Sequence, residues 1–245
     1  MISLSDPRLS NPVLSVLKVQ PTERIISIRE NADADSSFVI SHLLKQILYE
    51  RHRACLVTLH NDFNHYYHVG KKLGYDLRRA LETDDLKVID PLSDIVDGIG
   101  EIDADPDFLK RIFMSIKCKL EGLASSETHR AYLIVDDLSH FWDLGIEIAH
   151  IVTFVNCCAN MVDSNVSLIL GTHVGSENDR IISNTLEYIG DVHVVVSPLK
   201  TGKSGDVTGT LDVQRVSGTD YYHFRTFDRG VKTFHPGESI YHMYK

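Results

Sequence analysis

The chain has 245 residues, of which 43% are hydrophobic and 24% charged, and its formal net charge is −9. This length and composition fit one large soluble α/β domain, and the acidic balance argues against a dedicated nucleic-acid-binding protein, although it leaves room for a local basic patch. The sequence has no apolar stretch after a charged N-terminal segment and no apolar run of about 18 residues, so we expect an intracellular protein without a membrane span.

The N-terminal segment differs from the rest of the chain. Residues 1–23 contain Pro7, Pro12 and Pro21 among short apolar runs, and we expect a lead-in or contact arm that packs on the body or on a partner. From residue 24 onward, the spacing of apolar residues predicts alternating strands and helices. The predicted strands are 24–29, 54–60, 86–89, 131–135, 166–171 and 192–196, and the predicted helices are 37–50, 64–73, 107–122, 145–161 and 180–189.

The pattern changes after Gly209. Short strands are predicted at 210–216, 221–227 and 231–234, and hairpin turn signals separate them. Strands that alternate with helices favour a mostly parallel sheet, whereas consecutive short strands favour an antiparallel meander. We therefore predict a single RecA-like α/β domain over 24–245, with a mostly parallel central sheet flanked by helices and a C-terminal antiparallel meander.

The turn at 30–37 lies between the first strand and the first helix, where a RecA-like ATPase carries its P-loop. A P-loop needs glycines, which let backbone N–H groups approach the phosphates, and a lysine that neutralises phosphate charge. This turn has neither, and it carries Glu30, Asp33, Asp35 and Ser36 instead. Each carboxylate about 6 Å from a phosphate charge would cost roughly 3 kcal/mol at an effective dielectric constant of about 20. We predict a degenerate P-loop and no nucleotide cofactor.

A second feature of a nucleotide site follows the strand 131–135. The apolar run ends in Asp136 and Asp137, as in a Walker B motif, whose aspartate helps to hold the Mg²⁺ of a nucleotide. An aspartate that serves as a turn residue or helix cap gives the same pattern. Residues 201–204 read Thr-Gly-Lys-Ser, but they are expected to join two strands and not to open a helix, so we assign no P-loop there.

Histidines and cysteines indicate no metal site. His65 and His68 are spaced to share one face of a helix, but no cysteine or carboxylate completes a ligand set, so no metal is predicted. The four cysteines lie in apolar segments without paired ligand spacing, and we expect reduced thiols.

Basic residues cluster at Lys71, Lys72, Arg78 and Arg79. They are candidates for contacts with a nucleic-acid backbone, and Arg180, after the strand 166–171, is a further candidate. The alternative interpretation is a solvated helix end whose positive charges interact favourably with the helix dipole.

Several stretches, in their order and spacing, resemble one known family. They are Asp35-Ser36-Ser37-Phe38-Val39, Phe63-Asn64-His65-Tyr66 with its continuation at 69–74, the stretch 133–139, and the glycine-containing stretch 201–209. Together they resemble the Elongator complex protein 6 family over about residues 25–234. Thr208 departs from the family pattern, which commonly has histidine at this position.

The resemblance implies a non-catalytic RecA-like subunit without its own Walker A motif. We expect it in the cytoplasm, and a nuclear location in addition stays open. It implies assembly with the fourth and fifth Elongator subunits into a heterohexameric ring, which binds tRNA and supports modification of the wobble uridine by the catalytic subunits. Two alternatives stay open. One is an ATPase subunit with a divergent phosphate loop, in which Asp136 holds magnesium, and the other is a direct tRNA-binding module.

Overall fold

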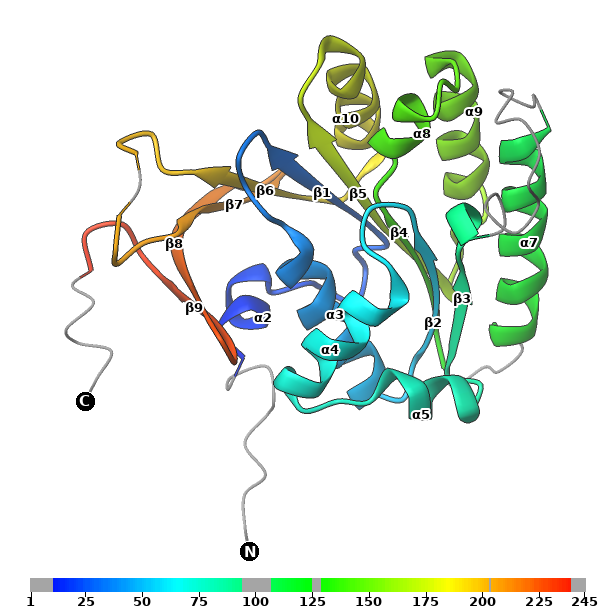
Figure 1. Cartoon of the computed structure of the whole chain (residues 1–245), viewed down its shortest axis with the longest axis horizontal. Helices are drawn as coiled ribbons and strands as arrows, with labels where there is room; N and C mark the ends of the chain where they lie inside the picture. The colour runs from blue at the N-terminus through cyan, green and yellow to red at the C-terminus, as the bar shows by residue number, and fades with distance from the viewer. Residues whose placement is uncertain (1–10, 94–106, 125–128, 203, 239–245) are drawn as a thin grey trace, which may run out of the picture.

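A nine-stranded sheet forms the centre of the molecule (Figure 1). The computed structural model describes residues 11–93, 107–124, 129–202 and 204–238. The strand order is β3-β2-β4-β5-β1-β6-β7-β8-β9, in which the strands from β3 to β6 pair in parallel and β7, β8 and β9 are added antiparallel. The strands are β1 (Ile25–Asn31), β2 (Arg53–Thr58), β3 (Leu86–Ile89), β4 (Ala131–Asp136), β5 (Val166–Val174), β6 (Val192–Pro198), β7 (Gly209–Arg215), β8 (Gly218–Phe227) and β9 (Gly230–Phe234). The predicted parallel sheet with a C-terminal meander is confirmed.

Helices cover both faces of the sheet (Figure 1). One face packs against α2 (Pro12–Leu17), α3 (Ser37–Tyr49), α4 (Phe63–Leu73) and α5 (Leu77–Glu82). The other face packs against α7 (Phe108–Leu123), α8 (Ser139–Asp143), α9 (Ile148–Ala159) and α10 (Glu177–Ile189). None of the helices in the described part of the chain is long and apolar enough to cross a membrane.

The apolar sequence of a central strand such as β4 follows from its position between two layers of helices. Along β4, Ile134 belongs to the core beneath α3, whereas Leu133 and Val135 belong to the core beneath α7 and α9. Side chains alternate between the two faces of a strand, and both faces here are covered, so β4 is apolar from Leu133 to Val135. Each such side chain, fully buried, contributes about 1.5–3 kcal/mol to folding.

The segment expected to be a lead-in packs against the body from Asn11 onward. The Asn11 side chain accepts hydrogen bonds from the Val13 and Leu14 amides at 3.1 and 3.3 Å and so caps α2. Val13 and Leu17 are fully buried, and α2 packs against α3 and β9. Residues 1–10 lie outside the described part, and the role of this segment as a contact arm stays a prediction.

The helix predicted at 145–161 corresponds to α9 (Ile148–Ala159) and is slightly longer than it at both ends. Gly145, with φ of 82° in the left-handed region that favours glycine, lies between α8 and α9 and so outside the helix. The short helices α2, α5 and α8 were not predicted, because five or six residues are too few to show a helical period. The ends of the other elements differ from the predicted ones by a few residues.

Candidate functional site

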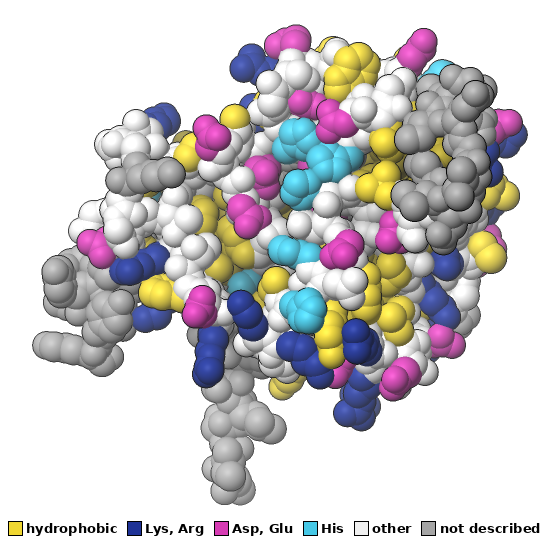
Figure 2. Space-filling view, in the orientation of Figure 1, with side chains coloured by type: hydrophobic (Ala, Val, Ile, Leu, Met, Phe, Trp, Pro, Cys, Tyr) yellow, Lys and Arg dark blue, Asp and Glu magenta, His cyan; other side chains and the backbone are white. Residues whose placement is uncertain are grey.

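The candidate site lies at the carboxyl ends of β1, β2, β4 and β5, which meet at one edge of the sheet because these strands are parallel. In open α/β sheets, ligands bind outside this edge. The turn after β1, the aspartates after β4 and several histidines come together here. Figure 2 shows histidines and acidic side chains gathered on this part of the surface.

The turn from β1 to α3 uses its own carboxylates where a P-loop would bind phosphate. One oxygen of Glu30 accepts a hydrogen bond from the Ser36 amide at 2.7 Å, and Asp35 accepts one from the Ser37 amide at 2.9 Å. These amides open α3, and the positive end of a helix dipole favours an anion at such a position. Burial raises the pKa of Glu30. The chain thus supplies a protein anion at the start of α3.

Asp33 and Ser36 complete the predicted degenerate turn. Asp33 lies at the turn with φ of 66°, in the left-handed region, and Ser36 is the residue before the first turn of α3. The Ser36 side chain makes no capping hydrogen bond. The amide of Ser36 is instead paired by Glu30, so Glu30 provides the acceptor that a capping side chain or a ligand would otherwise provide.

Asp136 is buried and held inside the chain. One of its carboxylate oxygens accepts hydrogen bonds from the Tyr66 hydroxyl of α4 and from the Asn61 amide group, the latter at 3.2 Å. The residue is 5% exposed, and burial is the main cause that raises the pKa of its carboxyl group. Asp136 therefore ties β4 to α4 and does not face solvent as a free magnesium ligand.

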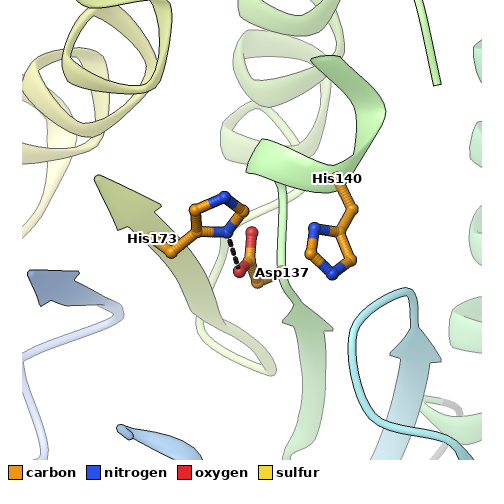
Figure 3. Close-up of side chains that lie close together, drawn as sticks. All are labelled: Asp137, His140 and His173. Carbon is orange, nitrogen blue, oxygen red and sulfur yellow. Dashed lines mark hydrogen bonds and ion pairs between the residues drawn. The ribbon is translucent and has the colours of Figure 1, made fainter. Parts of the chain in front are cut away.

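Asp137 lies beside His173, which comes from β5 (Figure 3). The His173 Nδ1 atom is 2.8 Å from one carboxylate oxygen of Asp137, and the Ser139 amide donates to the other oxygen at 2.7 Å. The hydrogen bond to Asp137 raises the pKa of His173 to about 9, since the carboxylate favours the charged imidazolium. The two side chains thus form a partly buried ion pair.

His140 lies on the other side of Asp137 (Figure 3). Its Nδ1 atom is 3.0 Å from a carboxylate oxygen of Asp143, and its Nε2 atom is 2.7 Å from Nδ1 of His60, which follows β2. Asp137, His140 and His173 offer ligand atoms that all lie within 4.8 Å of one another. Among the described residues, this is the group whose donors could hold a metal ion.

The basic residues divide into two separate places. Lys71, Lys72, Arg78 and Arg79 are exposed at the end of α4 and on α5, where Figure 2 shows Lys and Arg side chains gathered. Arg180 lies on α10, against the opposite face of the sheet, 3.6 Å from Glu177. The structure brings together the four residues of the predicted cluster and leaves Arg180 apart.

Within the cluster, two side chains are engaged. Lys71 forms an ion pair with Asp76, and the Arg78 guanidinium lies 4.2 Å from the centre of the Tyr67 ring. Lys72 and Arg79 are exposed neighbours of these two residues in the chain. The four charges therefore form one exposed patch that is anchored by Asp76 and Tyr67.

The two other sequence features lie outside the site. The Thr-Gly-Lys-Ser stretch belongs to the connection from β6 to β7, and its described residues form no helix, as expected. His65 and His68 both lie on α4, and no metal-ligand group among the described residues includes them.

The sequence reasoning missed the cluster of His60, His140 and His173. Each histidine follows or ends a different strand, so they are far apart in the chain and no local spacing marks them. A signal was present: His60, Asp137 with His140, and His173 all stand at carboxyl ends of predicted strands, which share an edge if the strands are parallel. Using that signal required the strand order, which the sequence alone did not provide.

The strand order, the turn at the P-loop position and the aspartates that end β4 define a RecA-like domain, here with an acidic turn in place of a glycine-rich one. A crystal structure of a KaiC-like protein from the archaeon Pyrococcus horikoshii matches the fold with a TM-score of 0.59 at 12% identity, over 86% of this chain and 90% of that chain. A likeness at this identity shows the fold alone.

A family model described as Elongation complex protein 6 matches residues 9–228, and the chain therefore belongs to this family. The Elongator complex protein 6 of Homo sapiens is 28% identical over 238 residues, covering 85% of this chain and 89% of the human protein. That of Drosophila melanogaster is also 28% identical over 238 residues, covering 91% and 94%. The family expected from the sequence is confirmed.

Proposed function

We propose that the chain is a non-catalytic RecA-like subunit of the Elongator complex. In this proposal it assembles with the fourth and fifth subunits into a heterohexameric ring, which binds tRNA and supports modification of the wobble uridine. The similar proteins carry the name of the complex, which supports membership. The proposal that the subunit is non-catalytic is argued from the geometry of the candidate site.

The main observation in support of a non-catalytic subunit is the hydrogen bond from the Ser36 amide to the Glu30 carboxylate at 2.7 Å. A P-loop offers such amides to a phosphate. Here a negative charge of the chain already occupies that position, and Asp35 adds a second carboxylate at the start of α3. A triphosphate would have to displace Glu30 and would be repelled by Asp35, without a lysine to offset the charge.

The neighbourhood of Asp136 supports the same conclusion. A Walker B aspartate must reach the water shell of a magnesium ion, but Asp136 is almost fully buried and is held by Tyr66 and Asn61. Its carboxylate links two elements of the fold. A RecA-like domain with this internal pairing keeps its shape without a bound nucleotide, as a scaffold subunit needs.

Two measurements test the proposal. The isolated chain should bind ATP with magnesium negligibly in calorimetry, and it should co-purify as a stable ring with the fourth and fifth Elongator subunits, with the mass measured by light scattering. Tight magnesium-dependent ATP binding by the chain alone would contradict the first part. Failure to assemble when all three subunits are mixed would contradict the second.

The substitution Asp136→Asn distinguishes the scaffold proposal from the ATPase alternative. Asparagine keeps the size of the side chain and an acceptor oxygen for Tyr66 and Asn61, which alanine does not. If the chain were an ATPase that uses Asp136 for magnesium, turnover by the assembled ring should be lost. If the aspartate serves the fold, turnover and assembly should stay as in the unchanged ring.

A direct tRNA contact by this subunit is a second candidate function. The observation that favours it is the exposed patch of Lys71, Lys72, Arg78 and Arg79 on α4 and α5. A phosphate backbone binds to such a patch largely through charge, and the affinity then depends on salt.

A further inference from the structure

We propose that Asp137, His140 and His173 form a binding site for one transition-metal ion of the Zn²⁺ type. This inference does not rest on the proposed assembly, because the proposed assembly assigns no role to these three side chains. The three residues stand at the carboxyl edge of the sheet: Asp137 directly follows β4, His140 lies on α8 and His173 on β5 (Figure 3).

The donor set has the chemistry of a zinc site. Two imidazole nitrogens and one carboxylate oxygen are ligands that Zn²⁺ uses in proteins, and three protein ligands leave one position of its tetrahedron open. Mg²⁺ and Ca²⁺ prefer oxygen ligands alone, so the two histidines favour a transition metal.

The distances are within reach of a coordinated geometry. The ligand atoms of the three residues lie within 4.8 Å of one another. Around a tetrahedral Zn²⁺ with bonds of about 2.0–2.1 Å, ligand atoms lie about 3.3 Å apart. Rotations of the side chains would bring these atoms to that spacing, and the ion would take the place of the proton that His173 holds against Asp137, so binding should strengthen as pH rises. The His140 and His173 side chains are 24% and 27% exposed, so an ion can reach the site from solvent.

The backbone holds the three residues in place before any ion binds. The Leu138 amide donates to the Gly171 carbonyl at 2.9 Å, and the Ser139 hydroxyl donates to the His173 carbonyl at 2.8 Å. These bonds fasten the start of α8 to β5. A Cβ atom on Gly171 would lie 3.3 Å from the Val135 carbonyl oxygen and 3.5 Å from the Cβ of Asp137, so glycine permits this close approach.

Further polar groups orient the ligands. The Ser139 amide donates to one oxygen of Asp137 at 2.7 Å, and the Asp143 carboxylate lies 3.0 Å from Nδ1 of His140. A metal-binding histidine usually donates its other ring N–H to such a carboxylate, which fixes the orientation of the ring and leaves the second nitrogen for the metal. Both ring nitrogens of His140 have partners within the chain, because Nε2 lies 2.7 Å from Nδ1 of His60, so a bound ion would take the place of one of these two hydrogen bonds.

The test uses the full chain, purified without a polyhistidine tag and freed of metal by chelation and dialysis. Zn²⁺ is titrated by calorimetry and Co²⁺ by its visible absorption, which is intense when the ion is tetrahedral. We expect one equivalent of either ion per chain. His140→Ala and His173→Ala should each weaken binding by at least about tenfold, the lower end of the loss seen even when groups that only orient ligands are removed.

Two exposed histidines outside the site supply matched controls: His68→Ala on α4 and His150→Ala on α9. Both should bind Zn²⁺ as the unchanged chain does. His140→Ala leaves the hydrogen bond between Asp137 and His173 in place, so it is the variant least disturbing to the fold, and circular dichroism verifies this. No stoichiometric binding by the unchanged chain, or equal binding by His140→Ala and the controls, would overturn the proposal.

Discussion

At the scale of single residues, the carboxylates at the P-loop and Walker B positions are paired with groups of the chain itself. Glu30 pairs with the amide at the start of α3, and Asp136 pairs with Tyr66 and Asn61. Both pairings are internal and partly or fully shielded from water. The acidic residues of this site are therefore structural acceptors, and their substitution should be visible in stability.

Glu30→Ala should lower the free energy of unfolding by about 1–2 kcal/mol, because the Ser36 amide loses its acceptor. Glu30→Gln keeps an acceptor oxygen, and burial already disfavours the charged form, so its loss should stay below about 1 kcal/mol. Urea unfolding followed by circular dichroism measures both. Equal losses for the two variants would show that the charge, and not the hydrogen bond, matters.

His42 should make stability depend on pH. Its Nδ1 atom donates to the Phe38 carbonyl at 2.7 Å, and burial, with a smaller effect from Lys45, lowers its pKa below 6.5. As pH falls, the unfolded chain takes up this proton before the folded chain does. The contribution of His42 is thus fully present above the unfolded pKa and is lost as pH falls below it toward the folded pKa.

The check compares urea unfolding at about pH 7.5 and about pH 5.5 for the unchanged chain, His42→Gln and the exposed control His150→Gln. The unchanged chain and the control should lose the same amount of stability on acidification. His42→Gln should lose less, whatever its stability at the higher pH. A slope equal to that of the control would contradict the account of His42.

At the scale of elements, the short helix α2 joins the N-terminal segment to the meander. The helix α2 contacts β9. In addition, the Arg215 side chain of β7 donates hydrogen bonds to the Leu17 carbonyl oxygen and to the Glu23 carboxylate, each at 2.6 Å. The Thr233 hydroxyl of β9 donates to the Pro12 carbonyl at 2.9 Å. These contacts bring the N-terminal segment against strands from the end of the chain.

Leu17→Ala should therefore cost about 2–5 kcal/mol of unfolding free energy, because it opens a cavity between α2 and its neighbours. Val216→Ala, at the fully exposed tip of the hairpin from β7 to β8, removes an apolar side chain that packs on nothing and should change stability by less than about 0.5 kcal/mol. Thermal and urea unfolding measure both. A similar small effect for Leu17→Ala would mean that α2 is dispensable for the fold.

The elements also show what the sequence could predict. The strands β2, β4 and β5 contain apolar runs at their centres because helices cover both faces, and such runs can be recognised without a structure. The acidic turn at Glu30 could be recognised as the wrong chemistry for a P-loop. Its pairing with Ser36 could not, since this depends on the path of the turn.

The histidine cluster could not be predicted for a similar reason. His60 and His140 are 80 residues apart in sequence, and His140 and His173 meet only because β4 and β5 are adjacent. Periodicity describes which face a residue occupies, but it carries no information about which strand lies next to which. The short helix α8 was not predicted for a different reason: its five residues, Ser139–Asp143, are too few to show a helical period.

At the scale of the whole molecule, charge is divided between regions of one surface. Figure 2 shows acidic and histidine side chains gathered near the carboxyl ends of the strands and Lys and Arg side chains over α4 and α5. The chain is acidic overall. A polyanion such as tRNA would therefore be repelled on average and attracted by the patch on α4 and α5.

The charge of this patch can be reversed without removing its internal contacts. Lys72→Glu with Arg79→Glu leaves the Lys71–Asp76 ion pair and the Arg78–Tyr67 contact intact. The matched control is Lys110→Glu with Lys117→Glu on α7, which packs on the opposite face of the sheet and has the same change in net charge. Both pairs are exposed. The control breaks the exposed ion pair between Lys110 and Asp107 at 3.7 Å, so circular dichroism verifies the fold of both variants.

If the patch binds tRNA, the Lys72/Arg79 variant should weaken tRNA binding by the assembled ring more than the control does. The slope of log affinity against log salt should also become shallower by about 0.7 for each phosphate that the variant no longer neutralises, since fewer counterions are released on binding. Fluorescence anisotropy at several salt concentrations measures both quantities. An equal fall in affinity for the two variants would indicate that only overall charge matters, and the patch would then have no specific role in binding tRNA.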